Sequence, residues 1–166
     1  MKALFVGRFQ PLHKGHEEVI RKLLEEYEKI IVLIGSKEKG RTQSNPFSYE
    51  ERKEMLEIVF SKEINDGKIV IDGIEDMDSD EDWTNAIIEK HEFDVVVTGS
   101  DWVAKCFEGK KEVKRIELIN PEKLNGTNIR RLMKEGSDEW KEYVSKEVAE
   151  YIQRIALKHF LESLSP

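Results

Sequence analysis

The stretch that most constrains the fold is Gly7-Arg8-Phe9-Gln10-Pro11-Leu12-His13-Lys14-Gly15-His16, because it connects an apolar run to an amphipathic one. Residues 2–7 have the composition of a buried strand, and the apolar residues of 14–28 recur at helical spacing. A strand, a glycine-containing loop and a helix in this order point free backbone N–H groups and the positive end of a helix dipole at one place. The decapeptide therefore predicts an anion site at the helix start, with phosphate as the obvious ligand.

Two histidines distinguish this loop from other phosphate-binding loops. The spacing of His13 and His16 lets both rings face one ligand, and Gly15 leaves room for a close approach. The patterns G-x-x-x-x-G-K-S/T and G-x-G-x-x-G are both absent from the loop. We therefore expect a phosphate site of another kind, and the alternative is that the two histidines are incidental surface residues.

Strand and helix patterns alternate along the rest of the chain. Apolar, largely β-branched runs predict further strands at 30–35, 68–71, 93–101 and 113–119. The intervening helices include one that Ser48 is expected to N-cap and one that Asp80 is expected to N-cap. This alternation is typical of a doubly wound α/β fold, with a mainly parallel sheet of five to six strands whose right-handed crossovers place the decapeptide at the ligand-binding carboxyl edge.

The domain organisation and the composition narrow further the class of protein to which the chain can belong. We expect one domain over 1–166, with an α/β core at 1–135 and a C-terminal helical tail at 137–164. The 34 acidic and 27 basic residues give a formal charge of −7, which argues against a general nucleic-acid surface. The single cysteine, Cys106, cannot form an internal disulfide, and no apolar run has the length of a membrane span. A cytoplasmic protein that binds neither nucleic acid nor membrane is expected.

The histidine signature resembles a known superfamily. His13-Lys14-Gly15-His16 is similar to the HxGH signature of the nucleotidyltransferases related to class I aminoacyl-tRNA synthetases. Preceded by Gly7-Arg8-Phe9-Gln10-Pro11, it resembles the archaeal-type nicotinamide mononucleotide (NMN) adenylyltransferases, which join NMN to the AMP part of ATP and make NAD. The resemblance implies a Rossmann-like nucleotidyltransferase fold, ATP and NMN as substrates, NAD as product, and Mg²⁺ carried by the ATP phosphates rather than by a metal site of the chain.

A second glycine turn leads into a helix at Leu124-Asn125-Gly126-Thr127-Asn128-Ile129-Arg130-Arg131. It resembles the superfamily's S/T-x-x-x-R type motif, which binds triphosphate; a plain capped helix with two surface arginines is the alternative. The resemblance implies that His13, His16 and Arg130 are catalytic. The residues that it implies for ATP binding are Gly7, Arg8, Phe9, Gln10, His13, Gly15, His16, Gly99, Gly126, Thr127 and Arg130.

The resemblance places the binding site for NMN, which accepts the AMP, in the acidic stretch before Trp83 and in the helix that contains Trp83. Its aspartates lack the glycine and glutamate spacing of a calcium loop. The archaeal-type enzymes carry a tryptophan stacked on the nicotinamide where Trp83 stands, although simple packing is the alternative. Relatives tend to have asparagine where Asp80 stands, and a carboxylate can accept from an amide but not donate to it. The NMN-binding residues implied are Phe9, Met77, Asp80 and Trp83.

The polar loop at 36–46 is expected to be mobile over the same edge. Lys39 and Arg41 are candidates for triphosphate contact, since Ser44 stands where relatives often carry an arginine. Arg52 falls where the family pattern has an arginine, and an exposed structural arginine is the alternative.

Two rival functions remain open at this stage. One is another adenylyl- or cytidylyltransferase of the superfamily with a phosphopantetheine, FMN or glycerol-phosphate acceptor, and the other is a nucleotide sensor that acts by binding alone. Intact His13, His16 and Arg130 favour an enzyme, and the aromatic Phe9 and Trp83 favour an aromatic acceptor. A homo-oligomer is compatible with the sequence, which fixes neither the oligomeric state nor the preference between NMN and its deamido form.

Overall fold

A five-stranded parallel sheet organises the structure, a computed structural model that describes residues 1–163 without the side chains of 157, 158 and 160–163. The strand order is β3-β2-β1-β4-β5. The strands are β1 (Lys2–Gly7), β2 (Lys29–Ile34), β3 (Ile69–Gly73), β4 (Val95–Thr98) and β5 (Glu112–Arg115). All four pairings are parallel. The predicted doubly wound fold is confirmed, with five strands.

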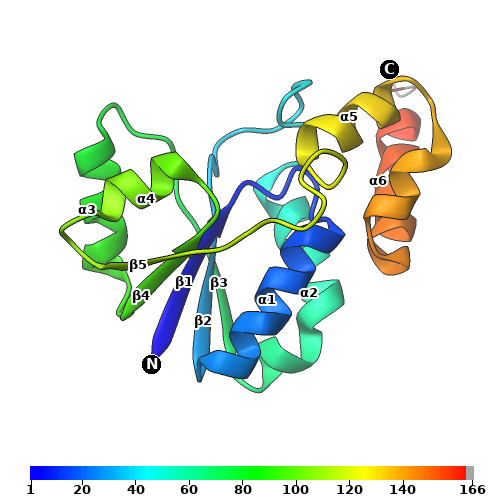
Figure 1. Cartoon of the computed structure of the whole chain (residues 1–166). Helices are drawn as coiled ribbons and strands as arrows, with labels where there is room; N and C mark the ends of the chain where they lie inside the picture. Colours follow the sequence, from blue (N-terminus) through cyan, green and yellow to red (C-terminus); the bar gives the residue numbers. More distant parts are fainter. Residues whose placement is uncertain (164–166) are drawn as a thin grey trace.

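Helices cover both faces of this sheet (Figure 1). One face packs on α1 (Lys14–Glu26), α2 (Tyr49–Asn65) and α5 (Gly126–Lys134), and the other on α3 (Asp80–Lys90) and α4 (Asp101–Phe107). Side chains of β1 alternate between the two cores, since Ala3 and Phe5 face one and Leu4 faces the other. Strands covered on both faces explain the continuous apolar runs in the sequence.

The chain changes direction across the sheet between β1 and β4, and this switch point locates the site. β2 and β3 are added on one side of β1, whereas β4 and β5 are added on the other. Connections leaving the carboxyl ends of β1 and β4 therefore turn to opposite faces and leave a crevice between them. The loop from Gly7 to His13 and the turn at Gly99 border this crevice.

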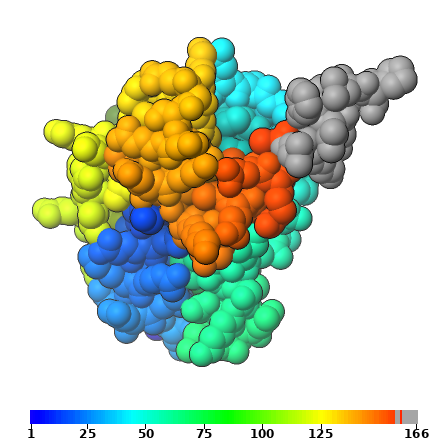
Figure 2. All heavy atoms as spheres, turned by 90° about the vertical axis from the view of Figure 1, so that its right-hand side faces the viewer, coloured from blue at the N-terminus to red at the C-terminus, as the bar shows by residue number. Residues whose placement is uncertain are grey.

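The C-terminal segment is helical but interrupted. A 3₁₀ helix, η1 (Asp138–Tyr143), follows α5, and α6 (Lys146–Ser163) follows it after a break at Val144 and Ser145. Trp140, Val144 and Val148 join the core that α2 also faces. Figure 2 shows α6 lying against α2. The expected tail end, Leu164, lies outside the described residues.

Two expected boundaries were wrong. The fifth strand ends at Arg115 rather than at 119, because the chain leaves the sheet and exposes Leu118 and Ile119. Ser79, not Asp80, is the N-cap of α3: its hydroxyl accepts from the N–H of Asp82 at 3.0 Å. The capping box of α2 is confirmed, with Ser48 and Glu51 each accepting from the other's backbone N–H. No described helix is long and apolar enough to cross a membrane.

Candidate functional site

The two histidines form the start of α1 as a reciprocal cap. Nδ1 of His13 accepts from the N–H groups of Gly15 at 3.1 Å and of His16 at 3.4 Å. In return, Nδ1 of His16 accepts from the N–H of His13 at 3.2 Å. The two rings stack with their centroids 3.6 Å apart. Because both Nδ1 atoms accept hydrogen bonds, the proton of each neutral ring is on Nε2, which is left to donate to a ligand.

Burial keeps both imidazoles neutral. It lowers the pKa of His13 to about 4. The pKa of His16 is also well below its usual value, because of burial and then of the charge that His13 would carry. Near neutral pH the pair therefore supplies two Nε2–H donors without positive charge. The sequence left the protonation state open, and the fold decides it.

The ring of Phe9 packs against the histidine pair. Its ring is 1% exposed and lies 4.7 Å from the His16 ring. A Cβ at Gly7 would lie 3.0 Å from the Phe9 ring, and a Cβ at Gly15 would lie 2.9 Å from the His13 ring. These two glycines are therefore needed for ring packing. The Phe9 side chain is part of the core and, like those of His13 and His16, lines neither cavity described below, so its expected contact with both substrates stays a prediction.

Gln10 is a second residue whose side chain has a structural role. Its amide is buried and pairs with the backbone of Phe47, donating to the carbonyl at 2.9 Å and accepting from the N–H at 2.9 Å. Its own carbonyl accepts from Nη1 of Arg130 at 2.8 Å. Gln10 thus ties the histidine loop to the segment before α2 and to α5, and its expected contact with ATP stays a prediction.

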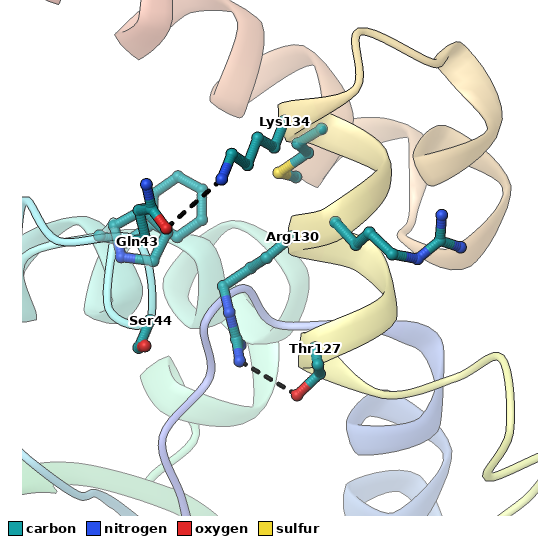
Figure 3. A pocket seen from close by; sticks show the side chains of 9 residues that line it. Gln43, Ser44, Thr127, Arg130 and Lys134 are labelled. Atoms are coloured by element: carbon teal, nitrogen blue, oxygen red, sulfur yellow. Dashed lines mark hydrogen bonds between the residues drawn. The ribbon is translucent and has the colours of Figure 1, made fainter.

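The start of α5 brings Arg130 next to the loop that carries the two histidines. Its Nη2 donates to the Thr127 hydroxyl at 3.3 Å (Figure 3). A Cβ at Gly126 would lie 2.5 Å from Nη1, so a side chain there would displace the guanidinium from this position over the helix start. Partial burial and the nearby charge of Arg8 lower the pKa of Arg130. Two guanidinium groups whose charges act on each other, beside the positive ends of two helices, favour binding of a polyanion.

A cavity of about 560 Å³ opens beside Arg130, between α5 and the loop at 43–47 (Figure 3). Thr127 and Arg130 line it, and so does Lys134 one turn further along the helix, with Nζ 3.5 Å from Oε1 of Gln43 on the opposite wall. We call this the phosphate cavity. Lys134 was missed at the sequence level, although its spacing from Thr127 and Arg130 places all three on one face of a helix.

The two loop cations that the sequence favoured lie elsewhere. Lys39 forms an ion pair with Asp76 at 2.9 Å, and Arg41 forms a bidentate pair with Glu51 at 2.6 and 2.9 Å. Neither residue lines the phosphate cavity. Their contact with triphosphate therefore stays a prediction that requires these pairs to open.

Arg52 is buried and organises the loops around the site. Its side chain is 0% exposed, so the interpretation as an exposed structural arginine was wrong. The guanidinium donates to the carbonyls of Arg8, Gly35, Ser36, Lys39 and Ser48 at 2.8 to 3.2 Å. A planar group with five donors suits such a set of acceptors, and ammonium does not. Arg52 thus fixes the loops after β1 and β2 relative to α2.

A second cavity, of about 300 Å³, lies over the carboxyl ends of β1 and β2. We call it the acceptor cavity. Its lining comprises Val6, Gly7, Arg8, Gly35, Ser36, Asp76, Trp83, Ser100, Trp102 and Val103. Arg8 lines this cavity, and its Nη1 lies 3.5 Å from Oδ1 of Asn45 in the loop that borders the phosphate cavity, so its guanidinium lies between the two cavities. The candidate site therefore has one half with cationic side chains and one half with aromatic side chains, and Arg8 lies between them.

The expected acceptor residues divide between this cavity and the surface. Trp83 lines the cavity but is only 3% exposed, because it packs against Trp102 and Phe107. Met77 is 43% exposed and Asp80 is exposed, and neither lines the cavity. The carboxylate at the cavity wall is that of Asp76, which accepts from the Ser36 hydroxyl at 2.9 Å and pairs with Lys39; the expected contacts of Asp80 and Met77 with NMN stay predictions. Asp80 is the first residue of α3, after the Ser79 cap, and its side chain is exposed.

Gly99 and Cys106 are two further residues that the sequence singled out. Gly99 follows β4, and a Cβ there would lie 3.2 Å from the Leu118 side chain, so this glycine allows close packing of the loop after β5. Its expected contact with ATP stays a prediction. Among the described residues, no group of three or more His, Cys, Asp and Glu side chains is placed to hold a metal ion. Cys106 is a partly buried free thiol whose pKa is raised by burial.

The parallel sheet, the paired histidines over its carboxyl edge and the arginine at the α5 start define a nucleotidyltransferase of the α/β class. The family model described as cytidylyltransferase-like matches residues 4–132. The chain is 39% identical over 161 residues to a nicotinamide-nucleotide adenylyltransferase of Thermococcus sibiricus, covering 93% of this chain and 84% of the relative. It is 37% identical to the Archaeoglobus fulgidus protein of the same name, covering 93% and 92%.

A solved structure has a similar fold. The bifunctional NMN adenylyltransferase/ADP ribose pyrophosphatase of Francisella tularensis, in complex with AMP and a manganese ion, superposes with a TM-score of 0.71 at 25% identity. The match covers 88% of this chain and only 43% of that longer one. The chain therefore belongs to the cytidylyltransferase-like family and, within it, to the archaeal nicotinamide-nucleotide adenylyltransferases.

Proposed function

We propose that this chain transfers AMP from ATP to NMN, giving NAD and pyrophosphate. The observation that carries the proposal is the juxtaposition at one sheet edge of a cluster of N–H donors and an aromatic cavity, with Arg8 between them. The first fits a triphosphate and the second fits a flat base. The names of the 39% and 37% identical relatives support the same reaction.

The reaction is a single displacement at phosphorus that transfers an adenylyl group. An oxygen of the NMN phosphate attacks the α-phosphorus of ATP, and the bond from that phosphorus to the oxygen bridging to the β-phosphorus breaks. Pyrophosphate leaves with the electron pair. The attacking phosphate is an anion at neutral pH, so no general base is required. The protein must align two polyanions and stabilise the negative charge that spreads over the phosphates.

The described residues are suited to that role. The Nε2–H groups of His13 and His16 are fixed donors, because the Nδ1 atoms are held by the backbone. Arg130 and Arg8 supply positive charge, and the starts of α1 and α5 supply free N–H groups. We propose that His13, His16 and Arg130 contact the reacting phosphates, while Gly126 and Thr127 hold the triphosphate.

We propose Mg²⁺ as the metal, entering as its complex with ATP. The charged side chains that line the phosphate cavity, Arg130, Arg131 and Lys134, are all cations, which bind anionic oxygens and repel a bare cation. Bound to the triphosphate, the metal neutralises part of its charge. The manganese ion bound with AMP in the Francisella structure supports a divalent ion in this fold. The cytoplasmic location and the oligomeric state stay predictions.

The test is pyrophosphate release from ATP with a panel of acceptors: NMN, its deamido form, phosphopantetheine, FMN and glycerol phosphate. We expect turnover with NMN above turnover with the three unrelated acceptors, and NAD as the product by mass. A better rate with any of those three would assign another transferase reaction. ATP binding without turnover on any acceptor would assign a sensor.

A further inference from the structure

Two residues beside the candidate site have the left-handed backbone conformation that residues with side chains disfavour. The φ angle is 53° at Phe9 and 48° at Ser36. Phe9 comes two residues after the end of β1, and Ser36 comes two residues after the end of β2, which pairs with β1. Both therefore lie at the carboxyl edge of the sheet. A residue with a side chain keeps this conformation where the surrounding structure stabilises it.

The guanidinium of Arg52 supplies this stabilisation at both positions. Its Nη1 donates to the carbonyl of Arg8 at 3.0 Å and to the carbonyl of Gly35 at 2.8 Å, and these residues come directly before Phe9 and Ser36. The φ angle of a residue sets the direction of the preceding carbonyl, so a donor fixed on that carbonyl also fixes φ. One buried nitrogen therefore holds the backbone in the left-handed conformation after both strands.

The two residues held in this way carry or border functional groups in different halves of the site. The ring of Phe9 lies 4.7 Å from the ring of His16, and Arg8 precedes Phe9 directly. Ser36 lines the acceptor cavity. A change of φ at Phe9 would move the aromatic support of the histidine pair, and a change at Ser36 would move the wall of the acceptor cavity. The position of one half relative to the other therefore depends on Arg52.

The chemistry of Arg52 fits a positioning role better than a role in stability alone. Its five hydrogen bonds use all five N–H groups of the guanidinium, and all five acceptors are neutral carbonyls. Burial accordingly lowers the pKa of Arg52. Burying a cation without an anionic partner is costly, and a well-packed apolar side chain would stabilise a helix at such a place more. What the cation adds is a fixed geometry for the two loops.

We infer that Arg52 is a positioning residue for the adenylyl transfer: by holding Phe9 and Ser36 in the left-handed conformation, it aligns the half of the site with cationic side chains, the phosphate half, with the half with aromatic side chains, the acceptor half. The inference rests on the proposed function, because alignment of two substrates is measured through their reaction. Arg52 lines neither cavity and so acts through the loops. Misalignment of bound reactants lowers kcat more than it raises KM.

The first experiment separates alignment from stability. Arg52→Lys keeps the positive charge but has three donors, which cannot reach all five carbonyls. Its kcat should fall about 10- to 100-fold, as for a small misplacement of bound reactants, while the KM values for ATP and NMN change less than about three-fold. Leu56→Val is the matched control, because it lowers stability by shortening a buried side chain one turn further along α2. Its kcat should equal that of the wild type.

The second experiment tests the backbone conformation itself. Ser36→Gly and Ser36→Ala both remove the hydroxyl that bonds to Asp76, but glycine adopts a positive φ without a penalty and alanine does not. In the Arg52→Lys background, kcat should therefore be about five-fold higher with Ser36→Gly than with Ser36→Ala. With Arg52 intact, the two Ser36 variants should have similar kcat values. Circular dichroism and thermal unfolding establish at which temperature each variant is folded.

The outcomes distinguish this inference from the proposed function. Wild-type turnover with NMN, together with an unchanged kcat in folded Arg52→Lys, would overturn only the role of Arg52. Equal kcat values for the Ser36→Gly and Ser36→Ala double variants would also overturn it. If no variant that carries Arg52→Lys folds, Arg52 is required for folding and its role as a positioning residue is overturned. Absence of NMN turnover in the wild-type protein would overturn both the proposed function and the inference.

Discussion

The two halves of the site hold their functional groups in different ways. In the phosphate half, His13, His16 and Arg130 are each hydrogen-bonded to backbone or to a neighbouring side chain before any ligand arrives. In the acceptor half, Trp83 is held mainly by packing against Trp102 and Phe107. The first half is a set of fixed donors, and the second is a shaped apolar surface beside one carboxylate.

This difference predicts different kinetic roles. Fixed donors stabilise charge that develops during the reaction without having to reorganise, so their loss should appear mainly in kcat. Packing against a base is the same in the ground state and in the transition state, so its loss should appear mainly in KM. Changes in the phosphate half therefore test this division most strongly.

The largest effect is expected for His16→Ala, which should lower kcat about 100- to 1000-fold, as for removal of one preorganised donor in other enzymes. Binding of ATP, measured by calorimetry with a nonhydrolysable analogue, should change little. His16→Gln is the control, because glutamine at this helix position can still accept from the His13 N–H and preserve the cap. A kcat near wild type in His16→Ala would remove the histidine from the reaction.

Arg130→Lys should cost about 10- to 100-fold in kcat, from the loss of charge-assisted hydrogen bonds. Lysine keeps the charge but cannot bond to the Gln10 carbonyl and the Thr127 hydroxyl while also reaching a phosphate. Steady-state kinetics at saturating ATP and NMN measure this effect. Unchanged kcat would mean that Arg130 is a surface residue whose contacts serve only α5.

The third prediction concerns pH and stability in the ligand-free protein. The folded protein lowers the pKa of His13 to about 4, whereas in the unfolded chain it is near 6.5. The unfolded state thus binds more protons between these values, so the free energy of unfolding should fall as pH decreases from 7 to 5, by about 2 kcal/mol from His13 alone. Above pH 7 this contribution is complete and constant.

The matched variant for this test is His13→Asn. Asparagine is among the best N-caps, so the start of α1 is retained while the titrating ring is removed. Urea unfolding at pH 7, 6 and 5 should give a flatter pH dependence in His13→Asn than in wild type. Parallel curves would show that His13 is protonated equally in both states, contrary to its burial.

The smallest effect is expected for Lys134→Met, which should raise the KM for ATP about three-fold and leave kcat nearly unchanged, as for the loss of one exposed charge contact. The effect should shrink at high salt, since exposed charges are screened. Lys62→Met is the matched control, because Lys62 is an exposed lysine of α2 that lines neither cavity. Equal changes in both variants would indicate a general charge effect.

The capping residues show which helix starts the local sequence could predict. The box of Ser48 and Glu51 was predictable because both partners lie within one turn and belong to a recognised pattern. The box of His13 and His16 uses the same geometry with imidazole nitrogens in place of oxygens, so the residue types gave no such signal. The prediction that Asp80 is the N-cap of α3 was wrong for a related reason. Ser79 beside it is an equally good cap, and only the path of the chain into α3 selected the serine.

Local patterns in the sequence determined the parallel α/β fold, the position of the phosphate loop and the presence of the HxGH and Gly126–Arg130 motifs, because periodicity, glycine placement and short spacings are properties of neighbouring residues. The tertiary structure decided which side chains remain available. Burial made the two histidines neutral, enclosed Arg52 among carbonyls and covered Trp83 with Trp102. These outcomes depend on contacts between residues distant in the chain, and solvation and packing act through such contacts.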